Sequence, residues 1–510
     1  MSAVDMPHED VNQAGETNKT PELPVIVRGK VIHVQSPYLT RALAEDILNG
    51  YPGISHSPSE LVFREPFQPL LHRWGDLLKF MERDDLDETT KAHTTILHEI
   101  LEREMHNTIG VFKQHILSRD ITFDHAWMIF QPGCIVVSSF KSGLAAYELD
   151  RAEYRETQLG KMLRLYCECL DWHGGQYCRK MSNIDLFEFE GTHKIKTLEA
   201  FPIELSDDKE QIKSRLEKQG EDFASFVHYQ YQAYSGPAFT WDADGYKQEI
   251  QVSGRIIIDP KSFDQFSPYC SGRWKRMSAR DYDMLMTSRA TQNAMRKLRV
   301  NVEGSPVIVL SSFHHMICSS MVRGYSTKLK MWLEFSVSHV TETSQVSSPV
   351  ESVRFSESME KIISSFARVR PTTERGLWTP DQIEHIAMSI HILGEGSRLE
   401  GTTAEAVSDR IGIPLLTINR DDLGTSLLQT ESRLREILEL VHQWHTLVLL
   451  DGIDFLVDGS SSYDFGLDDV LRIIVYDLNN RSYKGPFFIS TNQADDVYKA
   501  LLMVSNSSDE

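Results

Sequence analysis

Three things are scarce in this sequence, and each absence narrows what the chain can be. No run of about 18 apolar residues occurs, so we expect no transmembrane helix. The 510 residues include only six scattered cysteines, which suits free thiols in a reducing compartment. Residues 1–24 are polar and acidic, and they lack the apolar core of a signal peptide and the arginines of a transit peptide. We therefore expect a disordered tail at 1–24 and a location in the cytoplasm or the nucleus.

Positive charge is also scarce, with 53 Lys and Arg against 73 Asp and Glu, for a net charge of −20. Nucleic acids and anionic membranes are polyanions that bind basic surfaces. We therefore expect neither as a partner, and we expect a protein partner instead.

One basic island, within 269–300, departs from this balance. Its cations are Arg273, Lys275, Arg276, Arg280, Arg289, Arg296, Lys297 and Arg299. The favoured interpretation is the solvated face of a connecting helix, because Asp281 and Asp283 dilute the patch. Docking onto an acidic partner or an RNA is the alternative.

A chain of this length is expected to form roughly two to four domains. Residues 25–120 predict a helical N-terminal region that opens on a β-like run at 25–34. Residues 121–268 contain short β-type runs and one amphipathic helix near 207–233, which together predict an α+β domain. Residues 269–385 are expected to connect this domain to the last one, with a Ser/Thr-rich linker at 341–352.

From residue 386 to residue 510, apolar strand-like runs alternate with amphipathic helix-like segments. The runs are Ile386–Leu393, Ile413–Ile418, Thr446–Leu450 and Pro486–Ser490. This alternation predicts an α/β domain with a parallel sheet covered on both faces. Ligands bind such sheets at the carboxyl ends of the strands. Gly394, Asp451 and Asn492 each follow a strand, so we expect them to share one site.

The segment after the first strand has the glycine spacing of a phosphate-binding loop but no lysine. Its candidate residues are Gly394, Gly396, Gly401, Thr402 and Thr403. Glycines let backbone N–H groups converge on phosphates, and a Lys normally neutralises the charge where Thr402 stands. In a second register, Glu400 takes the Lys position and Gly401 the Thr position. A like charge about 4 Å away, at an effective dielectric near 20, costs about 4 kcal/mol. Nucleotide binding is therefore expected to be weak or lost.

The stretch Pro414–Trp444 resembles a group of fungal AAA+ ATPases. Upstream segments resemble the uncharacterised N-terminal domain that accompanies this ATPase, namely Ile121–Gly133, Phe189–Gly191 with Leu198–Pro202, Gly254–Asp259 and Val322–Trp332. The resemblance covers about 120–335 and 386–495. It implies a P-loop AAA+ fold for residues 386–510, with ATP and Mg²⁺ as the ligands of an intact site.

The same resemblance shows where this chain departs from the family. Asp451 matches the Walker B aspartate, which would hold Mg²⁺, but Gly452 stands where the catalytic Glu belongs. Asn492 matches the sensor residue, and Gln493 replaces an Arg. The helical lid and distal arginines that the family implies are not found before Glu510, and Asp454 is expected to point elsewhere. We expect a degenerate, C-terminally truncated ATPase module.

Three functions follow from these features. The leading hypothesis is a pseudo-ATPase that acts through protein–protein contacts, with an intact AAA+ relative as a candidate partner. The first alternative is an active ATP-dependent remodelling enzyme, in which Asp451 would hold the metal and Asn492 would position water. The second alternative is a nonfunctional product of a truncated gene.

Cys167, Cys169, His173 and Cys178 lie close enough in sequence to raise the question of a zinc site. The favoured interpretation is a β-hairpin with buried thiols, so no zinc is expected. His314, His315 and Cys318 are likewise interpreted as core residues.

Overall fold

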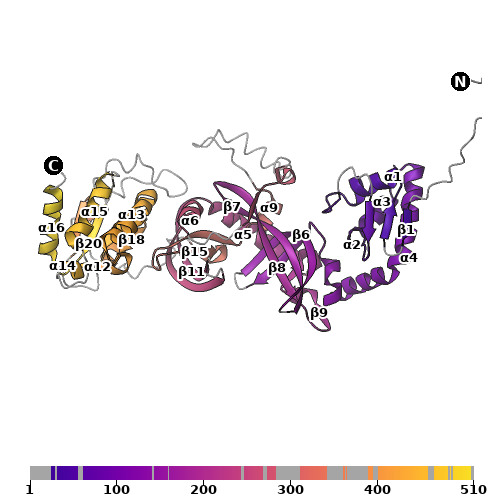
Figure 1. Cartoon of the computed structure of the whole chain (residues 1–510), viewed down its shortest axis with the longest axis horizontal. Coiled ribbons are helices and arrows are strands. Elements are labelled where there is room, and N and C mark those ends of the chain that lie inside the picture. Colours follow the sequence, from indigo (N-terminus) through magenta and orange to yellow (C-terminus); the bar gives the residue numbers. More distant parts are fainter. Residues whose placement is uncertain are drawn as a thin grey trace, which may run out of the picture. The chain divides into compact units, whose positions relative to one another are not determined.

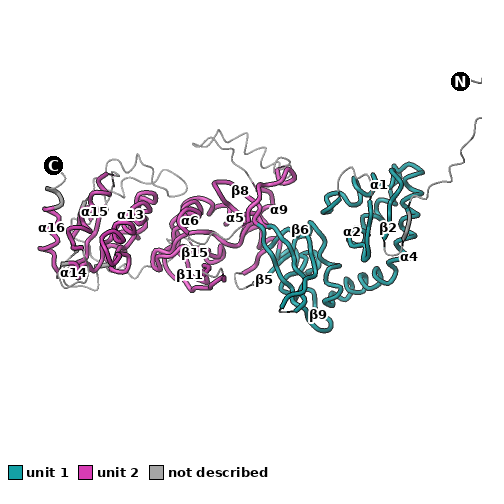
Figure 2. Tube along the Cα trace, in the orientation of Figure 1, with its two compact units in different colours: residues 1–138, 146–168, 181–212 teal, residues 139–145, 169–180, 213–510 magenta. Residues whose placement is uncertain are grey.

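The computed structural model describes residues 25–506, apart from 29–30, 55–60, 141–142, 159, 243–245, 268–272, 283–309, 342–359, 362, 364–388, 394–399, 458–464, 481–482 and 484–485. The chain divides into two compact units (Figure 2). Unit 1 comprises residues 1–138, 146–168 and 181–212, and unit 2 comprises 139–145, 169–180 and 213–510. The tail at 1–24 and most of the expected linker at 341–352 lie outside the described residues.

Unit 1 begins with a small sheet packed among helices. Its strands β1 (Val25–Arg28), β2 (Val31–Val34) and β3 (Leu61–Arg64) pair antiparallel. The helices are α1 (Pro37–Ala42), α2 (Gln68–His72), α3 (Trp74–Met81) and α4 (Glu88–Ser118), with a π-helical turn, η1, at Leu43–Ile47. The region is mainly helical, as expected, but the single β-like run at 25–34 is two strands of a three-stranded sheet.

Helix α4 follows from local sequence signals. Asp87 caps it by accepting a hydrogen bond from the Thr90 N–H at 2.8 Å, which satisfies one of the free donors at a helix start. Leu97, Leu101 and Met105 recur at helical spacing and are buried. The helix therefore contributes one apolar face to the core of this region.

Long strands form a second sheet in the order β10-β5-β6-β7-β8-β13. Their bounds are β5 (Ile135–Phe140), β6 (Gly143–Thr157), β7 (Gly160–His173), β8 (Gln176–Phe187), β10 (Ala200–Pro202) and β13 (Trp274–Arg276). Two further short strands, β4 (Asp120–Thr122) and β9 (Thr192–Lys194), pair with each other. Of the described cations of the basic island, Lys275 and Arg276 lie on strand β13 and Arg280 lies in a short helical segment, so the island is only partly helical. Arg289, Arg296, Lys297 and Arg299 lie outside the described residues.

A third sheet, in unit 2, is here called the upstream sheet. Its strands are β11 (Gln230–Trp241), β12 (Lys247–Ile258), β14 (Met321–Ser326), β15 (Met331–Ser336) and β16 (Val340–Thr341). The order is β12-β14-β15-β11-β16, and an additional β11–β12 pairing closes the sheet on itself. Strands β14 and β15 come from the region that the sequence analysis assigned to a connector. Helices α5 (Lys209–Ser225), α6 (Pro260–Phe266) and α9 (Ser312–Met316) accompany these strands.

The last part of unit 2 is the α/β domain that the alternating pattern predicts (Figure 1). Its four parallel strands lie in the order β17-β20-β19-β18. They are β17 (Ser389–Leu393), β18 (Leu415–Ile418), β19 (Leu447–Leu450) and β20 (Pro486–Ser490). The helices are α12 (Glu400–Ile411), α13 (Leu427–Trp444), α14 (Asp454–Val457), α15 (Leu467–Asn480) and α16 (Ala494–Asn506), with a 3-10 turn, η8, at Arg420–Asp422.

Burial explains why these strands are so apolar. Every residue of β19 and β20 is buried, which is typical of parallel strands covered on both faces. Among the described helices of the whole chain, none is long and apolar enough to cross a membrane.

Candidate functional site

The candidate site lies at the carboxyl ends of β19 and β20, which are neighbours in the sheet. Asp451 follows β19 directly, and its N–H donates to the carbonyl of Ile418 at 2.8 Å. Asn492 comes two residues after the end of β20 and is exposed. Since parallel strands present their carboxyl ends at one edge, the topology brings both predicted residues to the same edge.

Asp454, the first residue of α14, also lies at this edge. One carboxylate oxygen accepts hydrogen bonds from the Thr491 hydroxyl at 2.6 Å and the Asn492 N–H at 2.9 Å. The other accepts from the Asn492 side-chain amide at 3.1 Å. The expectation that Asp454 points elsewhere is therefore wrong. Its position in the sequence could have predicted this contact. Asp454 lies in the first turn after the buried strand β19, where an aspartate can reach the loop that follows the neighbouring strand, β20.

Gly452 separates these two aspartates and has a left-handed backbone, with φ of 61°. A side chain at this φ costs about 1–2 kcal/mol because Cβ crowds the following carbonyl. The position where the resemblance places a catalytic Glu is therefore shaped for glycine.

The candidate phosphate loop is only partly described. Gly394 and Gly396 lie outside the described residues, whereas Gly401, Thr402 and Thr403 lie in the first turns of α12. Thr403 is half-buried. Helix α12 begins at Glu400, so the Lys positions of both registers, Glu400 and Thr402, lie in its first turn. No lysine occurs between 394 and 411 in the sequence.

The electrostatics of the edge are acidic. Burial, reinforced by the neighbouring carboxylates of Asp409 and Asp451, raises the pKa of the Glu405 carboxyl, while Lys328 opposes the rise. Asp409 pairs with Arg255 at 3.0 Å, so Glu405 and Asp451 are the two of these carboxylates that would repel an approaching phosphate.

Two parts of the chain match known protein families. Residues 401–508 match the ATPase family associated with various cellular activities (AAA). The chain carries an AAA ATPase family domain. Residues 112–207 match a domain of unknown function (DUF7025), so an uncharacterised domain precedes the AAA domain as the resemblance implied. No curated protein matches the chain.

An AAA domain raises the question of whether these residues fit ATP and Mg²⁺. A bound nucleotide needs a cation for its β and γ phosphates and oxygen ligands for Mg²⁺. Here the lysine is missing, and both oxygens of Asp454 already accept hydrogen bonds from Thr491 and Asn492. Among the described residues, no group of three or more His, Cys, Asp or Glu could hold a metal. The Asp451 carboxylate and the Thr403 hydroxyl remain as candidate ligands for Mg²⁺. Without a lysine, however, the residues lack the cation that an intact Mg²⁺–ATP site places on the phosphates.

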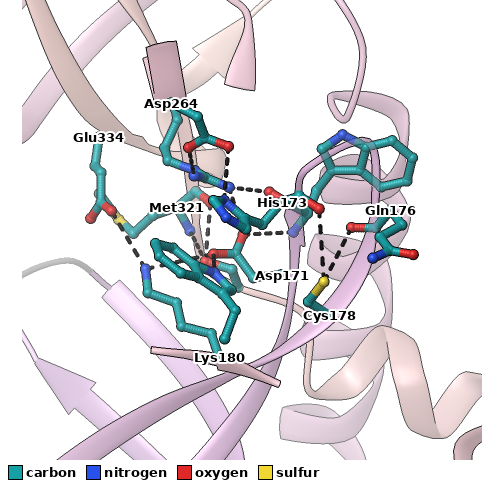
Figure 3. Close-up of polar contacts among 12 residues, drawn as sticks. Asp171, His173, Gln176, Cys178, Lys180, Asp264, Met321 and Glu334 are labelled. Atoms are coloured by element: carbon teal, nitrogen blue, oxygen red, sulfur yellow. Dashed lines mark hydrogen bonds and ion pairs between the residues drawn. The ribbon is translucent and has the colours of Figure 1, made fainter. Parts of the chain in front are cut away.

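A second cluster of charged side chains lies in unit 2, between the tip of the β7–β8 hairpin and strands β14 and β15 (Figure 3). Arg323 forms an ion pair with Asp264 and lies 3.8 Å from Asp171. Lys180 lies between Asp171, at 3.7 Å, and Glu334, at 3.5 Å. The adjacent cavity measures only about 10 Å³, room for one water molecule at most. The cluster is thus a closed ion network that joins two hairpins, not a ligand site.

The cysteine group takes the form of a hairpin. Cys167 and Cys169 are buried on β7, and Cys178 on β8 lies 3.7 Å from the carbonyl oxygens of His173 and Gln176. Burial raises the pKa of the Cys169 thiol to about 12, which disfavours the thiolate that a metal needs. His173 stacks on Trp274 and pairs with Asp264 at 2.8 Å. Of the three residues interpreted as core, His314 and Cys318 are buried, whereas His315 is only half-buried.

Proposed function

We propose that the AAA domain is a pseudo-ATPase that acts through protein–protein contacts. The observation that carries this proposal is the engagement of Asp454 with Asn492. The residue that would position water in an active site here serves as a hydrogen-bond donor within the fold. The left-handed Gly452 and the absent lysine support the same conclusion.

Exposed apolar side chains on α15 and α16 support the second half of the proposal. Tyr476 lies on α15, and Tyr498, Leu502 and Met503 lie on α16, with exposed fractions between 46% and 66%. The two helices pack against each other. Exposed apolar groups gathered on neighbouring helices are typical of a surface that another protein covers. An intact AAA relative is the partner we propose.

The decisive experiment compares the wild-type chain with Asp451→Asn in two assays, Mg²⁺–ATP turnover and binding of a fluorescent ATP analogue. We expect no turnover by either protein, and binding weaker than micromolar. Turnover that Asp451→Asn abolishes would refute the pseudo-ATPase proposal. The contact is tested by adding the wild-type chain or Tyr498→Ser to an intact AAA ATPase. A change in its activity with wild type but not with Tyr498→Ser supports the proposed surface.

The alternative is an active remodelling ATPase. The observation that favours it is the arrival of Asp451 and Asn492 at the ends of adjacent parallel strands, which is the arrangement that nucleotide chemistry requires. In that case Asp454→Asn would free the Asn492 amide and raise turnover. Under the leading proposal, the same substitution leaves turnover absent.

A further inference from the structure

Helices α12 and α13 and the turn η8 are bound to the upstream sheet by polar contacts within unit 2. Arg255 on β12 pairs with Asp409 on α12, Nη2 to Oδ1, at 3.0 Å. Their side chains are only 17% and 25% exposed, so water screens this pair less than a surface pair. Lys330, in the turn between β14 and β15, pairs with Asp422 of η8.

Trp444, the last residue of α13, provides a second group of contacts. Its indole Nε1–H donates to the carboxylate of Asp259 at 2.7 Å, and its carbonyl accepts from the hydroxyl of Tyr229 at 3.2 Å. The neighbouring Gln443 donates to the hydroxyl of Ser262 at 2.7 Å. Trp444 is buried, and a buried indole that keeps its hydrogen bond is held in one orientation.

The apolar core is continuous across the same contact. Ile257 of β12 is fully buried within the hydrophobic cluster that contains the strands of the AAA domain. Tyr325 and Trp332 of the upstream sheet lie 5.5 and 5.6 Å from Trp444, ring centre to ring centre. The upstream sheet thus covers part of the AAA core that solvent would otherwise reach.

Helix α12 buries few large apolar side chains in the core of the AAA domain. The side chains that it buries in the core of the domain are small, with Ala404 and Val407 fully buried. A helix of about twelve residues is only marginally stable without tertiary contacts. Among its polar side chains, Ser408 donates to the carbonyl of Ile413, Arg410 lies 3.7 Å from Glu360, and Asp409 pairs with Arg255 of the upstream sheet. The Ser408 hydroxyl also bonds to Tyr231 of the upstream sheet.

We propose that the upstream sheet controls the order and position of α12, the helix that follows the candidate phosphate loop, through the ion pair of Arg255 with Asp409. The position of α12 beside the candidate site would then depend on the upstream sheet, which precedes the AAA domain in the chain. This regulatory contact goes beyond the proposed function, because it holds whether or not a nucleotide binds. A protein that binds the upstream sheet and displaces Arg255 would therefore change the order and position of α12 at the candidate site.

Hydrogen exchange of the full chain tests this directly. In Arg255→Ala, the amides of α12 should exchange about tenfold faster, since a charged hydrogen bond of this kind contributes to local stability. Arg472→Ala is the matched control, because Arg472 pairs with Asp469 on the same domain but away from the contact. It should leave α12 unchanged.

Two further variants keep the test decisive. Asp409→Asn keeps the shape of the side chain and removes its charge, so it should also speed exchange in α12 while α4 stays protected. The exchanged pair Arg255→Asp with Asp409→Arg should restore protection. Unchanged α12 exchange in both Arg255→Ala and Asp409→Asn, or an equal change in Arg472→Ala, would overturn the proposal.

Discussion

The carboxylate of Asp454 holds Asn492 by two hydrogen bonds, one from its backbone N–H at 2.9 Å and one from its side-chain amide at 3.1 Å. The same carboxylate accepts from the buried hydroxyl of Thr491 at 2.6 Å. Three donors therefore converge on one side chain where β20 leads into α16.

Asp454→Ala should lower the free energy of unfolding by about 2–4 kcal/mol, because it removes charge-assisted bonds and leaves the Thr491 hydroxyl buried without an acceptor. Urea unfolding followed by tryptophan fluorescence measures the loss. Glu436→Ala, at an exposed position on α13, should cost less than about 0.5 kcal/mol. Equal losses in the two variants would show that Asp454 does not stabilise this junction.

Gly452→Ala should destabilise the AAA domain by about 1–2 kcal/mol, since its φ of 61° is unfavourable for any residue with a Cβ. No atom lies within 4 Å of the added Cβ, so the cost is purely conformational. Gly466→Ala is the control, because that site has equal space and no positive φ. The melting temperature of both variants distinguishes them, and an unchanged value for Gly452→Ala would contradict the left-handed turn.

Gly220→Ala should destabilise unit 2 by about 1–3 kcal/mol or more, the range for overpacking a tight contact. A Cβ on this residue of α5 would clash with the backbone carbonyl of His315, which cannot rotate away as a side chain could. Gly110→Ala on α4 meets nothing within 4 Å and should be neutral or slightly stabilising. The melting temperature measured by circular dichroism should therefore fall in Gly220→Ala and should stay the same or rise slightly in Gly110→Ala.

Stability should fall as the pH drops from about 6.5 toward 4, because burial lowers the pKa of His72 to about 4. Its Nε2–H donates to the carbonyl of Trp127 at 3.1 Å, and its Nδ1 bonds to the Tyr51 hydroxyl at 2.9 Å. The unfolded chain binds the proton at a normal pKa of 6.5, so in this window it holds more protons than the folded chain.

The slope from His72 alone should reach up to about 1.4 kcal/mol per pH unit. His72→Gln keeps a donor and an acceptor but cannot titrate, so its unfolding free energy should change less between pH 6.5 and pH 4. Urea unfolding at several pH values measures both proteins. Parallel pH profiles would show that His72 is not the responsible group.

The parallel sheet can be predicted from local sequence, because its strands are largely apolar and a helix separates each strand from the next. The upstream sheet is harder to predict. Strands β14 and β15 belong to this sheet because β14 pairs with β12, which lies much earlier in the chain. Tyr325 of β14, for example, pairs with Ile257 of β12, 68 residues before it. Local periodicity carries no information about a partner at that distance.

The candidate site divides in the same way. Asp451 and Asn492 could be placed because they come one and two residues after the ends of their strands. The role of Asp454 could not, because it depends on how one helical turn directs the carboxylate toward a loop 38 residues later. The ion pair between Arg255 and Asp409 could not be predicted from the sequence either, since it joins residues 154 positions apart.

The division of the chain into two units has a consequence for the choice of fragments to express. Residues 139–145 and 169–180 belong to unit 2, although unit 1 surrounds them in the sequence. A break at the ends of the uncharacterised domain, 112–207, would therefore carry away the hairpin tip with Asp171 and Lys180. It would separate Glu334 from Lys180 and Arg323 from Asp171, and Arg323 would keep only Asp264 of its two carboxylate partners. Fragments cut at the ends of residues 112–207 should therefore fold poorly on both sides of the cut. A fragment that folds must keep residues 139–145 and 169–180 together with the rest of unit 2.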